Sequence, residues 1–367
     1  MVEAETPNPH AWICNLFFRG DFMKLMETMC ERGHEKVLFV NNEKAGLRAI
    51  IAVHNTVRGP AIGGCRLYPY ASSDDALFDV LRLSRGMSHK NAAAGLDFGG
   101  GKGVIIADPS QKTEAMFEAF AEAVNALGGC YITAEDVNTD CDDALIMARK
   151  TKYICGLPHI SGDPSPFTAI GVLQGIKATN KVLNGTDSLD GVKIAVQGIG
   201  KVGFDLCHRL AKEGAILYVS NRTNMEPLEK LRDEFGATIV PADKILSQEC
   251  DILAPCAMGA VVNPTTIPNF NCRAIAGAAN NVILDLASGE ALKARGILYA
   301  PDFIINGGGV INAAGEAAGN YNKEEVLKKV YNIYNTIERI LVESKNTGRP
   351  EGVIAEEFAE ECIWGKR

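Results

Sequence analysis

The sequence lacks several features that would place it in other classes of protein. No apolar run reaches the length of about 18 residues that a membrane span needs. No cluster of Lys and Arg stands out and the formal net charge is −8, which argues against nucleic acid as a partner. The 11 cysteines show neither a C-x-x-C pair nor zinc spacing, so we expect no metal site and reduced thiols in a cytoplasmic protein. The expected ligand is therefore a small molecule.

Length and pattern predict two domains of α/β type. A chain of 367 residues exceeds what one core supports, and its 47% hydrophobic content is ordinary for a globular protein. Residues 1–20 carry Glu3 and Glu5 in place of a basic signal segment, so we interpret them as an arm or tail, with Asp21 capping a first helix. Apolar spacing then predicts strands at 36–41, 47–54, 103–107 and 131–134, and helices at 75–87 and 113–127. This alternation indicates α/β layers with ligands at strand ends.

Two lysines stand in surroundings too apolar for a surface. Lys90 is followed by Ala92–Ala94, and Lys102 follows the glycines Gly99–Gly101 and precedes a β-branched run. A buried lysine needs an anionic partner, which a substrate carboxylate would supply. A lysine beside another cation in a poorly hydrated cleft also has a lowered pKa, so the pair is expected to be a carboxylate anchor and an acid/base.

We expect the three glycines to adopt positive φ angles and to let a ligand approach the backbone. The alternative interpretation of this segment is a helix, a glycine turn and a buried strand, with both ammonium groups reaching solvent.

A second pattern predicts a dinucleotide site. Gly198-Ile199-Gly200-Lys201-Val202-Gly203 follows a short apolar strand over 191–197 and precedes a helical run over 204–213. In this context the first glycine allows a tight turn, the second lets a pyrophosphate approach, and the third lets the helix pack on the strand. The alternative is a glycine turn that only joins a strand to a helix.

The choice of cofactor is indicated at the end of the next predicted strand, 215–220. A NAD-selective site has Asp or Glu here, whereas this chain has Asn221 followed by Arg222. Neutral Asn221 does not repel a 2′-phosphate and Arg222 can pair with it, which favours NADP over NAD. Alternatively, Arg222 is a solvated turn residue and Asn221 bonds a ribose hydroxyl.

Six ordered segments together resemble the leucine, valine, phenylalanine and tryptophan dehydrogenases of the glutamate dehydrogenase superfamily. They are Gly59–Gly64, Leu81–Gly95, Gly99–Lys102, Thr133–Val137, Ala254–Ala257 and Ile304–Asn312. The resemblance runs from about Asp21 to Glu361. It implies an N-terminal α/β substrate domain over residues 21–160, completed by C-terminal helices in 330–367, and a Rossmann NAD(P)-binding domain over 161–329, with a cleft between them.

The resemblance implies reversible, NAD(P)-dependent oxidative deamination of an apolar L-amino acid, branched-chain or aromatic, to its 2-oxo acid and ammonia. It also implies a homo-oligomer, either a dimer or an octamer. By the same resemblance Lys90 binds the α-carboxylate, Lys102 is the catalytic acid/base and Asp136 handles the protons of the amine, while Gly63 and Gly64 leave room for the substrate. For Asp136 the alternative is a helix N-cap.

Further site residues are implied in the same way. Those expected at the cofactor are Thr168, Gly198, Gly200, Lys201, Val202, Gly203, Asn221, Arg222, Cys256, Ala257, Asn280 and Asn306. Asn281 is expected at the substrate, although turn or cap chemistry can account for all three asparagines. The side-chain pocket is expected to be Ile62, Met87, Ala134, Val310 and Ala313.

All five pocket residues are apolar, which disfavours an acidic substrate. Ala313 stands where leucine-specific relatives carry a larger residue, which would free volume for a bulkier side chain.

Two readings outside this class remain. Ser220-Asn221-Arg222-Thr223 after a dinucleotide fingerprint also suggests a shikimate or methylenetetrahydrofolate dehydrogenase, and a non-catalytic nucleotide-sensing homologue would keep the fold.

Overall fold

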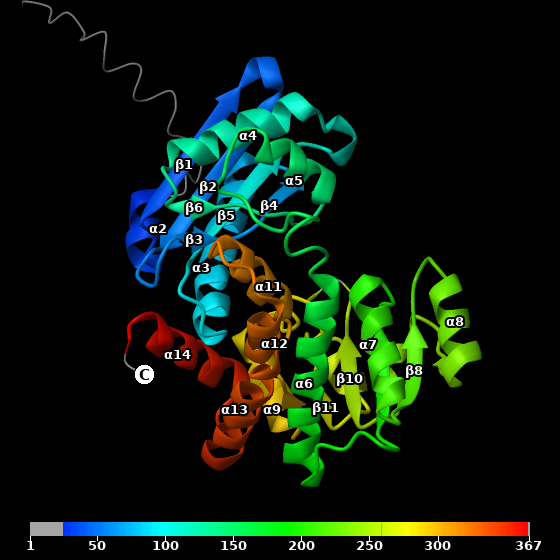
Figure 1. The fold of residues 1–367 in the computed structure, drawn as a ribbon. Helices are drawn as coiled ribbons and strands as arrows, with labels where there is room; N and C mark the ends of the chain where they lie inside the picture. The colour runs from blue at the N-terminus through cyan, green and yellow to red at the C-terminus, as the bar shows by residue number, and fades with distance from the viewer. Residues whose placement is uncertain (1–24, 258, 366–367) are drawn as a thin grey trace, which may run out of the picture.

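The computed structural model describes residues 25–257 and 259–365, which form two sheets with helices around them (Figure 1). The interpretation of residues 1–20 as an arm and of Asp21 as a cap concerns residues outside this range. No helix in the described part of the chain is long and apolar enough to cross a bilayer. The two-domain α/β class is confirmed, whereas the boundaries at residues 20, 160 and 329 stay predictions.

The first sheet is mixed. Its order is β1-β2-β5-β3-β6, with β4 paired to β5, and only β1, β2 and β5 pair antiparallel. The strands are β1 (Lys36–Asn42), β2 (Leu47–Asn55), β3 (Ala61–Ile62), β4 (Cys65–Tyr68), β5 (Gly99–Ile106) and β6 (Tyr131–Ile132). Helix α2 (Leu25–Arg32) precedes this sheet.

Both faces of the first sheet are buried by helices. Adjacent residues of a strand point to opposite faces, so Ile50 joins the cluster of α3 (Ser73–Ala93), whereas Ile51 joins that of α4 (Glu114–Ala126) and α5 (Cys141–Ala148).

Helix α3 is longer than the predicted 75–87. It begins after Ser72, whose side chain accepts a hydrogen bond from the backbone N–H of Asp75 at 3.0 Å, and it ends before Gly95, which has a left-handed φ of 66°. Lys90 therefore lies in the last turns of a helix rather than in a glycine loop.

The three glycines before Lys102 begin strand β5, and none has a positive φ, so both the expected positive φ angles and the glycine turn of the alternative interpretation are wrong. Close packing explains them instead. A Cβ atom on Gly100 would overlap the backbone nitrogen of Ser88 in α3, and one on Gly101 would lie 2.6 Å from the ring of Tyr131. The glycines thus let α3 and β6 pack directly on β5.

The second sheet is parallel throughout, with the order β12-β11-β10-β7-β8-β9. Its strands are β7 (Lys193–Gln197), β8 (Ile216–Ser220), β9 (Thr238–Ile239), β10 (Ile252–Pro255), β11 (Ala274–Ile275) and β12 (Leu298–Tyr299). Its helices are α6 (Ser165–Asn184), α7 (Lys201–Lys212), α8 (Glu226–Phe235), α9 (Leu286–Ala294) and α10 (Asp302–Ile305). The predicted strands at 191–197 and 215–220 are β7 and β8.

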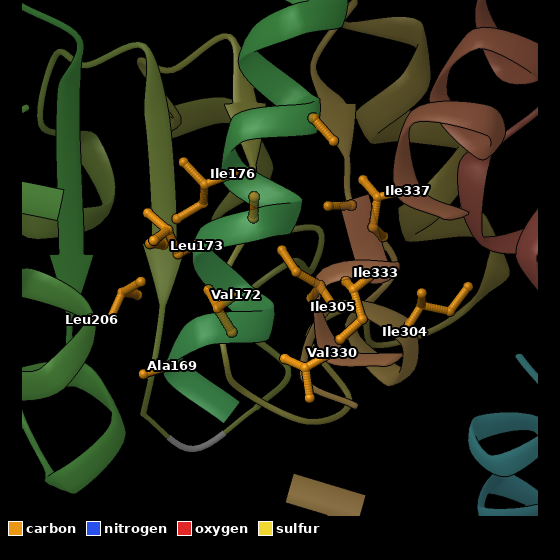
Figure 2. Close-up of a cluster of buried hydrophobic side chains, with 14 of the residues drawn as sticks. Ala169, Val172, Leu173, Ile176, Leu206, Ile304, Ile305, Val330, Ile333 and Ile337 are labelled. Carbon is orange, nitrogen blue, oxygen red and sulfur yellow. The ribbon is translucent and has the colours of Figure 1, made fainter. Parts of the chain in front are cut away.

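Helix α6 is packed on two sides (Figure 2). One side faces α7 through Leu206, and the other faces Ile305 and Ile333. A Cβ atom on Gly171 would lie 2.7 Å from the side chain of Ile333, so glycine allows the close approach. The C-terminal helices are α11 (Gly308–Ala317), α12 (Lys323–Tyr331), α13 (Ile333–Thr347) and α14 (Glu351–Ile363). Because α13 packs on α6 and α14 on α3, these helices join both halves of the chain.

Two glycine substitutions separate packing from backbone propensity. Gly100→Ala should destabilise the protein by about 1–3 kcal/mol or more, because a backbone atom cannot yield to the added methyl. Gly86 lies on the exposed surface of helix α3, and nothing lies within 4 Å of an added methyl group. Gly86→Ala should therefore stabilise the protein by about 0.5–1 kcal/mol. Thermal melting at equal protein concentration measures both, and equal melting temperatures for the two variants would contradict this explanation of β5.

Candidate active site

Residues from both halves of the chain line a cleft of about 590 Å³. The residues expected from sequence that line it are Ile62, Gly63, Gly64, Met87, Lys90, Lys102, Ala134, Asp136, Thr168, Lys201, Val202, Asn280, Asn306, Val310 and Ala313. Polar lining residues that the sequence did not single out are Glu135, Thr139, Asp140, Ser161, Ser165 and Asn312.

Lys102 lies at the centre of the cleft on β5 and is only 5% exposed. Its Nζ lies 3.1 Å from Oδ2 of Asp136, and the same oxygen accepts a hydrogen bond from Nε of Arg66 at 3.1 Å. Burial opposes the ionisation of Asp136, but the charges of Lys102 and Arg66 outweigh it and lower the pKa of Asp136 to about 2. The interpretation of Asp136 as an N-cap is wrong, because Asp140 caps the next helix. Equally wrong is the view that the Lys102 ammonium reaches solvent.

Lys90 has a different environment, although it lines the same cleft from α3. Its Nζ donates to Oδ1 of Asn280 at 3.3 Å, and no carboxylate of the described residues lies within ion-pair distance of it. Burial lowers the pKa of Lys90 to about 8; the more distant carboxylate of Asp302 opposes this, whereas Lys102 adds to it. Lys90 is thus a half-buried ammonium whose charge a ligand anion can match.

The asparagine loop after β11 reaches across to α3. Oδ1 of Asn280 accepts from Nδ2 of Asn306 at 2.7 Å as well as from Lys90. The buried Oδ1 of Asn306 has no hydrogen-bond partner among the described residues, which leaves it available to a ligand. Asn281 does not line the cleft; it adopts a φ of 53° and accepts from Nη1 of Arg82 at 2.9 Å.

The glycine fingerprint has the geometry that its spacing predicts. Gly198 has a φ of 93°, and a Cβ there would lie 2.8 Å from Cβ of Ala257. A Cβ on Gly203 would overlap the backbone oxygen of Gly198, whereas Gly200 faces open space at the uncapped N-terminus of α7. Such a helix end with no side chain in the way fits a pyrophosphate. Cys256, like Ala257, packs beneath this turn, and its backbone N–H donates to Gln197 at 2.7 Å.

The first residue of α7 and the end of β8 flank this turn. Nζ of Lys201 lies 3.6 Å from the carboxylate of Asp163, and the lysine side chain is 82% exposed. Asn221 donates from Nδ2 to the backbone oxygen of Asn224 at 2.9 Å, which shapes the turn. Arg222 is exposed and forms no ion pair with the described residues. These side chains are therefore accessible from solvent.

Apolar side chains from four elements form the other end of the cleft: Ile62, Met87, Ala134, Val310 and Ala313. They come from β3, α3, the segment after β6, and α11. The glycines beside them are required by close backbone packing, because a Cβ on Gly63 would overlap the oxygen of Gly101 and one on Gly64 that of Glu135. The room they leave in the cleft is a consequence of that packing.

Three charged residues near the cleft could not be recognised from the sequence as part of it. Arg66 binds Asp136, Asp302 acts on Lys90, and buried Glu316 accepts hydrogen bonds from the backbone of Gly156 and Leu157 in the segment that joins the two halves. Arg66 stands two residues after the glycine pair Gly63-Gly64, and this spacing is the local sequence feature that could have indicated its place near the cleft. The others depend on contacts made far along the chain.

Known proteins match both sides of this cleft. Residues 34–153 match the family described as Glu/Leu/Phe/Val dehydrogenase, dimerisation domain, and residues 215–360 match Glutamate/Leucine/Phenylalanine/Valine dehydrogenase. The chain is 48% identical over 345 residues to a leucine dehydrogenase of Bacillus subtilis (strain 168), covering 93% of this chain and 94% of the relative. It is 49% identical over 321 residues to a phenylalanine dehydrogenase of Bacillus thermotolerans, covering 85% and 83%.

A solved structure matches the fold of this chain. The crystal structure of L-tryptophan dehydrogenase from Nostoc punctiforme superposes with a TM-score of 0.82 at 41% identity, covering 93% of this chain and 98% of that one.

Proposed function

This chain belongs to the Glu/Leu/Phe/Val dehydrogenase family of amino-acid dehydrogenases, and we propose that it oxidatively deaminates an apolar, branched-chain or aromatic L-amino acid. The reaction is reversible, uses NAD(P), and yields the 2-oxo acid and ammonia. The observation that carries the proposal is the meeting of Lys90, Lys102 and Asp136 in one cleft opposite Asn280 and Asn306.

Each of the three charged groups has a distinct part in the reaction. Lys90 binds the α-carboxylate, because it is a half-buried ammonium that, among the described residues, hydrogen-bonds only to an amide. Lys102, in its neutral amine form, takes a proton from the water that adds to the imine carbon, and the resulting ammonium then stabilises the oxygen of the developing carbonyl. Asp136 is a carboxylate over the whole working pH range, so it accepts hydrogen bonds from the substrate ammonium and balances the positive charge of the imine.

The residues around α7 would hold NAD(P). Gly198, Gly200 and Gly203 form a turn that a pyrophosphate can approach, with Val202 and Thr168 beside it in the cleft. The unpartnered Oδ1 of Asn306 suits the carboxamide of a nicotinamide. When bound, the nicotinamide supplies an acceptor for the hydride that leaves Cα of the amino acid.

The lining of the cleft supports an apolar substrate side chain. Ile62, Met87, Ala134, Val310 and Ala313 offer no cation for a second carboxylate. Glu135 and Asp140 also line the cleft and repel an acidic side chain; burial raises the pKa of Glu135. We propose that small Ala313 admits bulky or aromatic side chains.

The family match to a dimerisation domain implies an oligomer, and we propose a closed symmetric homo-oligomer, either a dimer or an octamer. No two described cysteines form a disulfide, which supports a reducing, cytoplasmic location. Neither a shikimate nor a methylenetetrahydrofolate dehydrogenase explains the matched segment that contains Lys90, Lys102 and Asp136.

The proposal is tested by following nicotinamide absorbance with leucine, valine, phenylalanine, tryptophan and glutamate, each with NAD and with NADP. Turnover is expected with the apolar amino acids and not with glutamate. Activity restricted to glutamate would contradict the proposed substrate class, and no turnover with any of them would favour the non-catalytic homologue.

Substitution of the acid/base separates chemistry from binding. Lys102→Ala should lower the rate of deamination on the order of a hundredfold or more, because general acid/base catalysis contributes at least that much. Cofactor affinity, measured by nicotinamide fluorescence, should remain. Lys150→Ala, which removes a lysine from an exposed ion pair with Glu118, is the control. A Lys102→Ala enzyme with near-normal turnover would remove Lys102 from the mechanism.

The lowered pKa of Lys90 predicts how carboxylate binding depends on pH. The ammonium charge is present below pH 8 and is lost as the pH rises through about 8, so inhibition by 4-methylpentanoate should weaken above that value. This inhibitor has no amine that titrates. In Lys90→Gln the inhibition constant should be high and nearly independent of pH, since the charge-assisted contact is gone. A wild-type inhibition constant that is flat from pH 7 to 9 would place the carboxylate anchor elsewhere.

We propose a preference for NADP through Arg222. Arg222→Ala should then weaken the binding of NADP by about 1.5–3 kcal/mol, the range for a hydrogen bond to a charged group, and leave the binding of NAD nearly unchanged. Asn221→Asp should shift the preference toward NAD, since a carboxylate binds ribose hydroxyls and repels a phosphate. Values of kcat/KM with both cofactors measure this, with Arg232→Ala on exposed α8 as the control. If wild type prefers NAD and Arg222→Ala leaves the ratio unchanged, Arg222 is only a turn residue.

A further inference from the structure

The catalytic carboxylate is held by a second cation that the proposed reaction does not itself use. Oδ2 of Asp136 is 3.1 Å from Nζ of Lys102 and 3.1 Å from Nε of Arg66. The Arg66 side chain is 21% exposed, so water screens the interaction only partly. Arg66 extends from β4, beside the strand that carries Lys102.

Arg66 is itself fixed by a second carboxylate. Its Nη1 donates to Oδ2 of Asp79 in α3 at 2.9 Å, so the two sides of one guanidinium bind two different carboxylates. Oδ2 of Asp79 also accepts from the hydroxyl of Tyr70 at 2.7 Å, and its Oδ1 accepts from Arg82 at 2.8 Å. This arrangement orients the guanidinium so that its Nε faces Asp136.

The same series of contacts continues from α3 to the loop after β11. Arg82 donates from Nη1 to Oδ1 of Asn281 at 2.9 Å, so Asp136, Arg66, Asp79, Arg82 and Asn281 form one hydrogen-bonded series. This contact explains why Asn281 points away from the cleft.

Titratable groups on β4, β5, α3 and β6 interact electrostatically with the carboxylate of Asp136. Lys102 on β5 and Arg66 on β4 contact it, while Lys90 on α3 acts from farther away. The buried thiol of Cys65 and the buried hydroxyl of Tyr131 lie near enough for Asp136 to favour their neutral forms. Arg66 is therefore one of only two cations among the described residues that touch this carboxylate.

We propose that Arg66 is a positioning residue for the deamination reaction: it holds the Asp136 carboxylate in place beside Lys102, and Asp79 holds Arg66 there. The inference rests on the proposed function, because it concerns the carboxylate that acts on the substrate amine. Without Arg66, burial of Asp136 is opposed by Lys102 and by the backbone N–H of Val137, so the carboxyl group retains its proton to higher pH.

The test compares kcat and KM for deamination in wild type, Arg66→Met and Arg66→Lys. In Arg66→Met, kcat should fall, because the carboxylate of Asp136 is no longer held beside Lys102. KM should change much less than kcat, because Lys90 is untouched. Arg66→Lys retains the charge and should restore most of kcat.

A matched variant separates loss of charge from loss of packing. Asp79→Asn breaks the Arg66–Asp79 ion pair and loosens the hold on the guanidinium but keeps its charge, so kcat should fall less than in Arg66→Met. Arg149→Met, which removes an exposed arginine that pairs with Glu114, controls for the loss of any arginine. An Arg66→Met enzyme with wild-type kcat, or one in which the carboxyl group of Asp136 titrates as in wild type, would overturn the inference, as would an equal loss of kcat in Arg66→Lys.

A readout without turnover keeps this inference distinct from the proposed function. Infrared titration of Arg66→Met against the double variant Arg66→Met, Asp136→Asn isolates the carboxylic-acid band of Asp136. That band should appear at higher pH than the band obtained when wild type is compared with Asp136→Asn. If wild type deaminates no amino acid, the proposed function fails and the infrared titration still decides whether Arg66 controls the ionisation of Asp136.

Discussion

The direct packing of strand β5 on helix α3 is the constraint on which the rest of the site depends. A side chain at Gly100 would overlap the backbone of Ser88, so glycine is required for the two elements to meet. Their contact places Lys102, on the strand, and Lys90, on the helix, in one cleft although twelve residues separate them in the chain. Because Gly100 has no side chain, β5 and α3 can pack directly on each other, and this packing brings the two charges into one cleft.

Burial of charge then determines what the cleft can bind. An ammonium group withdrawn from water must be matched by an anion or lose its proton. Asp136 matches Lys102, whereas among the described residues Lys90 hydrogen-bonds only to the amide of Asn280. The charge of Lys102 is thus matched within the described chain, and that of Lys90 is not. The two lysines therefore differ in what their surroundings let them bind.

The two halves of the chain contribute different chemistry to the same space. The half that contains the mixed sheet supplies Lys90, Lys102 and Asp136, and the half that contains the parallel sheet supplies the glycine turn and the asparagines. Helices α13 and α14 pack on α6 and α3 (Figure 1). Glu316 of α11 accepts a hydrogen bond from the backbone of Gly156 in the joining segment. These contacts hold the two halves around the cleft.

The sequence by itself determined the α/β class, the glycine turn that begins at Gly198, and the lysine pair, because each depends on local periodicity or spacing. It misjudged Gly99–Gly101, which are required by close packing against the backbone of Asn55, helix α3 and Tyr131 rather than by their own φ angles. Only the tertiary structure decided that Arg66, 70 residues from Asp136, shares its carboxylate, and that Asn281 bonds Arg82 across 199 residues rather than the cleft. Such pairings depend on how elements far apart in the chain pack together, which local sequence patterns do not indicate.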